Sequence, residues 1–180
     1  MGLAAGVYEL GPDSGTLWIR TGRTGAVAKA GHDLLLHVTQ WSARLEIGAD
    51  PAASTVALDA DPRSLRVVEG TGGMMPLGDD DRASIVQTID EEILNGQDVA
   101  FRSTSVRPDG DGLDVAGDLT LAGATHPLAL RLAVGEGGAL SGQATIKQTD
   151  WGIKPYSALF GALKVADEIQ LGIDATVPAG

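Results

Sequence analysis

The chain has 180 residues, about the length of one domain, and 43% of them are apolar, so it can bury a hydrophobic core. Its formal net charge of −11, with no basic stripe to offset it, disfavours binding to nucleic acids and to anionic membrane surfaces. Cysteine is absent, which excludes disulfides and thiolate catalysis, and no apolar run approaches the ~20 residues of a membrane-spanning helix.

The first six residues contain neither a basic segment nor a long apolar stretch, so they do not resemble a signal peptide. We therefore expect a cytoplasmic protein. The remaining sequence contains no internal repeat, low-complexity tract or linker. We expect a single domain over residues 1–180.

Short alternating runs separated by turn residues begin near the N-terminus. Residues 16–21 have the period of a strand, and residues 26–47 form one long strand or a bent pair. Apolar residues hold even positions up to Val38 and odd positions from Trp41 onward. A period of two cannot change parity without an extra residue, so we predict a β-bulge or bend near Thr39-Gln40.

One clear helix is predicted from Arg82 to Leu94. Isoleucines at positions 85, 89 and 93 form an apolar stripe along it. The aspartates at 79–81 precede this stripe, and we interpret them as the N-cap and as partners of the positive helix end. A calcium loop is the alternative, but ligand spacing and a closing glutamate are missing, so the cap is favoured.

The most regular alternation lies between Leu113 and Leu132. Apolar residues hold odd positions before Gly123 and even positions after Pro127, which predicts an antiparallel hairpin with one apolar face. The turn between the arms is predicted to be longer than a two-residue link. Further strands are expected at residues 99–106, 140–148 and 166–177. The pattern indicates an all-β, antiparallel fold with one amphipathic helix.

Five segments, in order along the chain, resemble those of the YceI-like, polyisoprenoid-binding proteins. The hairpin carries G-x-L-T-x-x-G-x-T-x-P between Gly117 and Pro127. The other four are the opening segment 8–17, the Phe-x-Ser-Thr strand at 101–104, the segment 147–153 before the closing strand, and the closing strand 167–173. Each motif is modest, but the ordered set covers nearly the whole chain.

This resemblance implies a lipocalin-like, up-and-down antiparallel barrel of about eight strands, a size that can hold one small ligand. It also implies that a long polyisoprenoid, polyprenyl or quinone-like, is bound inside the barrel. The protein would then be a carrier, scavenger or storage protein and not an enzyme, with no cofactor besides the lipid. Members of the family often form homodimers, so the resemblance allows a homodimer here.

The residues that we expect to contact the ligand are apolar or aromatic. Trp151, Tyr156 and Phe160 belong to an irregular segment that we interpret as a rim or lid. His32 and Lys154 are candidates for contacts with a polar headgroup. Gln148 stands where the family has an arginine, which weakens the case for a diphosphate headgroup. The complete predicted set for the apolar ligand is Trp18, Leu34, Leu36, Phe101, Val115, Leu119, Leu121, Leu128, Leu130, Leu132, Trp151, Tyr156 and Phe160.

Two alternatives stay open. The first is a metal-dependent enzyme or stress-response protein that uses His32, Asp33 and His126. In an extended strand His32 and His37 would lie ~16 Å apart on opposite faces, so a local histidine pair cannot bind a metal ion. No Gly-x-Ser-x-Gly nucleophile motif is present. The second alternative is a barrel with a filled core that acts as a protein-interaction module.

Overall fold

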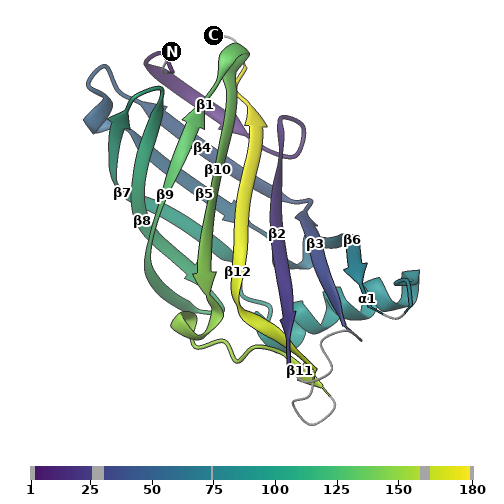
Figure 1. Ribbon diagram of the computed structural model, residues 1–180. Helices are drawn as coiled ribbons and strands as arrows, with labels where there is room; N and C mark the ends of the chain where they lie inside the picture. Colours follow the sequence, from purple (N-terminus) through teal and green to yellow (C-terminus); the bar gives the residue numbers. More distant parts are fainter. Residues whose placement is uncertain (1–2, 26–30, 74, 159–162, 179–180) are drawn as a thin grey trace.

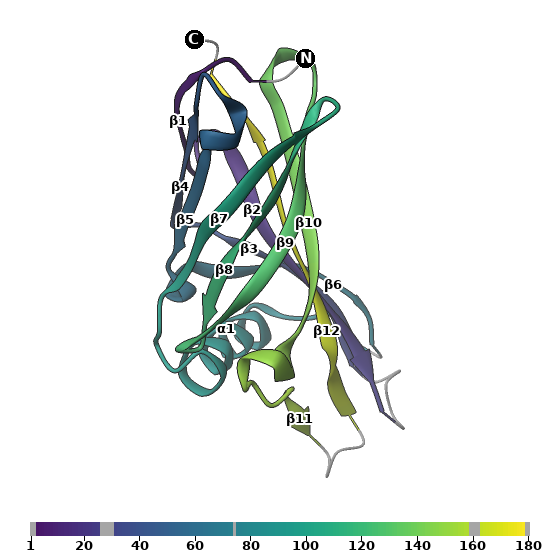
Figure 2. The same ribbon diagram turned by 90° about the vertical axis from the view of Figure 1, so that its left-hand side faces the viewer.

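The computed structural model describes residues 3–25, 31–73, 75–158 and 163–178, and it has one curled antiparallel sheet (Figures 1 and 2). The order of strands in the sheet is β1-β4-β5-β7-β8-β9-β10-β12-β2-β3-β6, and β11 pairs with β12. The strands are β1 (Gly6–Leu10), β2 (Gly15–Thr24), β3 (His32–Val38), β4 (Trp41–Ile47), β5 (Thr55–Ala60), β6 (Leu65–Gly72), β7 (Val99–Asp109), β8 (Gly112–Leu121), β9 (Ala124–Val134), β10 (Ala139–Lys147), β11 (Ser157–Ala158) and β12 (Leu163–Thr176).

The predicted fold class is confirmed, but the described residues form a 12-stranded sheet instead of one with about eight strands. The sheet has more strands partly because long stretches are broken at a corner. The stretch predicted at 26–47 is divided into β3 and β4 at Thr39 and Gln40, where the parity changes. Residues 26–30 of that stretch lie outside the described residues.

The corner is held by Ser64. The backbone N–H of Thr39 donates to the Ser64 carbonyl at 3.1 Å, and the N–H of Gln40 donates to Ser64 Oγ at 2.9 Å. The Asp61 N–H donates a hydrogen bond to the Gln40 carbonyl at 3.0 Å. The β3–β4 and β5–β6 stretches therefore turn together: β3 pairs with β2 and β6, and β4 pairs with β1 and β5. This joint bend curls the sheet around its apolar face.

The β8–β9 hairpin has the predicted apolar face. Leu113 pairs with Leu132 and Val115 with Leu130, so the apolar residues of both arms share one face. The prediction of a longer turn is wrong. Leu121 pairs with Ala124, which leaves only Ala122 and Gly123 as the turn, at φ values of 52° and 78°. Positive φ at both central residues is the requirement of a type I′ turn, which matches the twist of the strands.

The helix begins earlier than predicted. It comprises α1 (Asp79–Thr88) and a π-helical turn η4 (Ile89–Ile93). Gly78 is the N-cap, and its N–H donates to Asp81 Oδ2 at 2.9 Å. The predicted N-cap aspartates therefore form the first turn, where carboxylates still favour the positive end of the helix. In Figure 1 the helix lies across the lower end of the curled sheet.

The opposite end of the barrel, which we call the closed end, is tied by backbone hydrogen bonds. The Thr176 N–H donates to the Ser14 carbonyl and the Val177 N–H donates to the Gly138 carbonyl, both at 2.8 Å. Buried apolar side chains fill this end: Leu10, Ile47, Val106, Leu113, Val134, Ala175 and Val177. The barrel is therefore packed at one end, while the other is covered by the helix.

Candidate ligand-binding cavity

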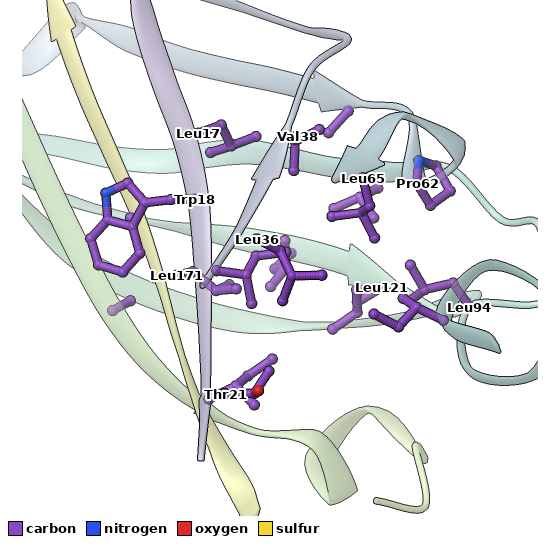
Figure 3. Close-up of a pocket in the computed structure, with 18 of the residues that line it drawn as sticks. Leu17, Trp18, Thr21, Leu36, Val38, Pro62, Leu65, Leu94, Leu121 and Leu171 are labelled. Atoms are coloured by element: carbon purple, nitrogen blue, oxygen red, sulfur yellow. The ribbon is translucent and has the colours of Figure 1, made fainter. Parts of the chain in front are cut away.

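A cavity of about 550 Å³ lies inside the barrel. Its walls come from the inner face of the curled sheet on opposite sides of the barrel, from the corner near Pro62 and from the helix. It therefore occupies the middle and the helix end of the barrel (Figure 3). Aliphatic side chains dominate the lining, and isoleucines 85, 89 and 93 of the helical segment form part of it. This volume falls in the range of small-ligand sites, roughly 300–1,000 Å³.

The structure places most of the predicted apolar residues on the cavity wall, where they alternate with outward-facing residues along β3, β7, β8 and β9. They therefore form one continuous surface although they come from distant parts of the sequence. These residues are Leu34, Leu36, Phe101, Val115, Leu119, Leu121, Leu128, Leu130 and Leu132.

Gly117 lets one of these side chains reach its position. A Cβ at Gly117 would lie 2.6 Å from Cζ of Phe101 and would also collide with the Arg102 carbonyl oxygen. The missing side chain therefore leaves the space in which the Phe101 ring lies against β8.

Gly117→Ala is expected to destabilise the fold by about 1–3 kcal/mol, because backbone and ring must both move to admit the methyl group. Gly22→Ala is the matched control, since its Cβ would have only an ordinary 3.8 Å contact with Ala166. Urea unfolding of both variants measures the difference. Equal unfolding free energies would show that Gly117 has no packing role.

Trp18 needs a correction. It borders the cavity wall, but its indole lies on the other side of β2 from Leu17 and Leu36 (Figure 3). The indole Nε1 donates to Asp174 Oδ2 at 2.8 Å, and the Arg20 guanidinium stands 5.4 Å from the ring centroid. The ring therefore covers the outer face of the barrel, because strand alternation turns it away from its inward-facing neighbours.

Trp151 also differs from the prediction of a rim residue. It is only 4% exposed, does not border the cavity, and donates from Nε1 to the Leu119 carbonyl at 2.9 Å. His126 stacks edge-on against it at 5.6 Å between ring centroids. In the described residues, β9–β10 pairing stops at Arg131↔Gln143. Trp151 packs where the two strands are no longer paired, and there it acts as a wedge in the barrel wall.

The remaining predicted residues have different positions. Tyr156 borders the cavity and is 46% exposed, so it stands at an opening of the cavity. We call this opening the mouth. His32 also lines the mouth, with its Nε2 2.7 Å from the Met75 carbonyl oxygen. Lys154 is exposed and does not border the cavity, because its neighbour Ile153 takes the buried position. Phe160 lies outside the described residues.

Several polar residues of the lining were missed, among them Arg23, Gln148 and Lys164. Arg23 lines the mouth, donates to the Gly31 carbonyl, and places Nε 3.6 Å from Asp33 Oδ1. Its odd position on the strand of Leu17 could have indicated that it faces inward. Gln148 is buried, borders the cavity, and donates from Nε2 to the Ala166 carbonyl at 2.9 Å.

Three or more His, Asp or Glu side chains able to hold a metal ion do not come together anywhere in the described ranges. His32 is at the mouth and His126 contacts Trp151. His37 pairs across the strands with Trp18. Among the helices of the described chain, none is long and apolar enough to cross a membrane.

The profile of the YceI-like domain matches residues 19–177. The chain belongs to this family. Among solved structures, the YceI-like chain resembles BcnA of Burkholderia cenocepacia, with a TM-score of 0.62 and 17% identity over 91% of this chain and 96% of BcnA. It also resembles the YceI protein of Campylobacter jejuni, with a TM-score of 0.57 and 15% identity over 81% and 85% of the two chains.

A third structure is described as a polyisoprenoid-binding domain from Saccharophagus degradans. It matches with a TM-score of 0.54 and 11% identity, over 97% of the YceI-like chain and all of the other. The UPF0312 proteins of Pseudomonas aeruginosa are 38% identical over 63 residues, which is 30% of the YceI-like chain and 33% of their own length. At these identities the solved structures establish the shared fold.

The segment around Trp151 is anchored to the closing strand of the YceI-like domain by Asp167. Thr149 donates from its backbone N–H to Asp167 Oδ1 at 2.9 Å and from Oγ1 to Oδ2 at 2.7 Å. The hydroxyl bond, followed by the backbone bond, lowers the pKa of the Asp167 carboxyl. The bonds join the turn η6 (Gln148–Trp151) to β12.

Acidification is expected to loosen this turn. A folded-state pKa below the unfolded value means that the stabilisation is present above about pH 4 and is lost as the pH falls through the lowered folded pKa. Hydrogen exchange at the Thr149 amide, corrected for the intrinsic rate, should therefore rise as the pH falls below about 4. Asp167→Asn should remove that pH dependence. An unchanged profile in the variant would contradict the anchor.

Proposed function

We propose that this YceI-like protein binds an isoprenoid-type lipid inside its barrel and acts as a carrier, scavenger or storage protein, not as a catalyst. The observation that carries the proposal is the aliphatic cavity of about 550 Å³. An apolar wall offers few hydrogen-bond partners to a polar metabolite, whereas each buried methylene of a lipid contributes ~0.8 kcal/mol to the free energy of binding. The description of the Saccharophagus degradans neighbour as polyisoprenoid-binding supports an isoprenoid over other lipids.

The mouth suits the polar end of such a lipid. Arg23, His32, Tyr156 and Lys164 border it. Gln148 adds a buried amide whose Nε2 is already bonded to the backbone. Arg23 is close to Asp33, which offsets part of its charge. A hydroxyl or carbonyl headgroup can accept hydrogen bonds from the donors at this mouth.

The alternatives have less support. A filled barrel would leave no space of this size between the sheet and the helix. An enzyme built on the histidines would need them at one place, yet His32 and His126 contact different parts of the described chain. The homodimer that the family resemblance allows stays a prediction.

Native mass spectrometry of freshly purified protein, followed by organic extraction, tests the proposal. We expect either a co-purified prenyl lipid or quinone at one per chain, or an apo protein that takes up one molecule of added farnesol. The same spectrum reports whether the protein is a dimer. An apo mass that does not change with added prenyl alcohols would overturn the proposed function.

A further inference from the structure

The cavity ends inside the barrel and does not run through it. Beyond Leu140, in the direction of the closed end, the buried side chains do not border the cavity and instead pack against one another. Leu140, Leu132 and Leu45 line the cavity at its boundary with this packed region, and each is at most 4% exposed. We call these three leucines the floor. A ligand that enters at the mouth must stop there.

The depth follows from β2, which runs from the mouth to the level of the floor. The lining residues of this strand extend from Arg23 to Leu17. Six residues at ~3.3 Å each span ~20 Å along the strand. A strand tilt of ~40° reduces this length to ~15 Å along the barrel axis.

An extended carbon chain with bonds of ~1.5 Å and angles of ~111° advances ~1.25 Å per bond. A depth of ~15–20 Å therefore holds ~12–16 bonds, or about three to four isoprene units with four main-chain bonds each.

We propose that the floor makes this protein selective for chain length, with a preference for prenyl chains of about three to four isoprene units. This inference rests on the proposed function. Each unit that enters the cavity adds buried apolar surface and affinity, whereas a unit that remains outside the mouth adds little. Affinity should therefore rise with chain length and then become constant.

The test is a competition series with geraniol, farnesol, geranylgeraniol and geranylfarnesol, each displacing the fluorophore phenylnaphthylamine from the purified protein. We expect affinity to rise by about tenfold or more from geraniol to farnesol, and to change by less than about threefold from geranylgeraniol to geranylfarnesol.

Two variants should move this limit in opposite directions. Leu140→Ala lowers the floor, so geranylgeraniol should gain about tenfold in affinity over farnesol, relative to the wild-type ratio. Ala144→Phe fills space halfway down the cavity, where Ala144 pairs with Leu171. In that variant geraniol should still bind, and longer chains should gain less than about threefold over it. Ile146→Ala, at a buried position that does not border the cavity, is the matched control and should leave the series unchanged.

The outcomes separate the two claims. If the protein binds none of the four alcohols, the proposed function fails. If all four bind and affinity keeps rising through geranylfarnesol, or if neither Leu140→Ala nor Ala144→Phe moves the limit, the proposed function stands and the role of the floor is refuted.

Discussion

Leu171→Trp is expected to reduce farnesol affinity by about 50-fold while the protein stays folded. Leu171 faces the cavity from β12, next to Ile19 of β2, and is only half-buried because its side chain borders the empty space. An indole there would occupy the path of the lipid and displace roughly three of its methylene groups. Because the ring enters a void, the free energy of unfolding should change by less than about 1.5 kcal/mol.

The matched control is Gln170→Trp, which places the same ring on the exposed outer face of the same strand. Fluorescence displacement and urea unfolding of both variants give the comparison. Undiminished binding by Leu171→Trp, in a variant that is shown to be folded, would mean that the ligand does not use the interior.

Trp151→Ala is expected to have the largest effect on stability, a loss of about 3–5 kcal/mol. The substitution removes a buried ring from the place where β9 and β10 are no longer paired. It also leaves the Leu119 carbonyl without its indole donor. Such a loss is a large share of the ~5–15 kcal/mol that stabilises a typical domain.

Trp18→Ala provides the contrast, because its indole lies on the outer face with Asp174 and Arg20. Its loss should cost about 1 kcal/mol, the scale of one hydrogen bond or one cation–π contact. Chemical denaturation of both variants under the same conditions tests the difference. Similar losses for the two tryptophans would contradict the role of Trp151 as a wedge.

Strand alternation could be predicted because it reflects one local property, the two faces of a strand. It predicted the shared apolar face of the β8–β9 hairpin and the bend near Thr39-Gln40. The same rule also places Trp18 opposite Leu17, so its outward indole follows from parity. The inward prediction for Trp18 did not follow this rule, and its indole covers the outer face, where it donates to a carboxylate.

The irregular parts could not be predicted in the same way. Trp151 follows the end of β10 in a 3₁₀ turn, where no period reports the direction of a side chain. Its position depends on where β9 and β10 stop pairing, which is a property of the whole barrel. Similarly, Gln148 has a polar side chain in that turn, and only the folded barrel shows that it borders an apolar cavity.

The central claim, that a lipid occupies the interior, is tested most directly by methyl-selective NMR during a titration with farnesol. We predict large shifts for the methyl groups of Leu34, Leu130 and Leu171, which border the cavity, and small shifts for Leu10 and Leu113 at the closed end. Shifts confined to exterior side chains, such as Val7 and Val68, would place the lipid on the outside and contradict the account.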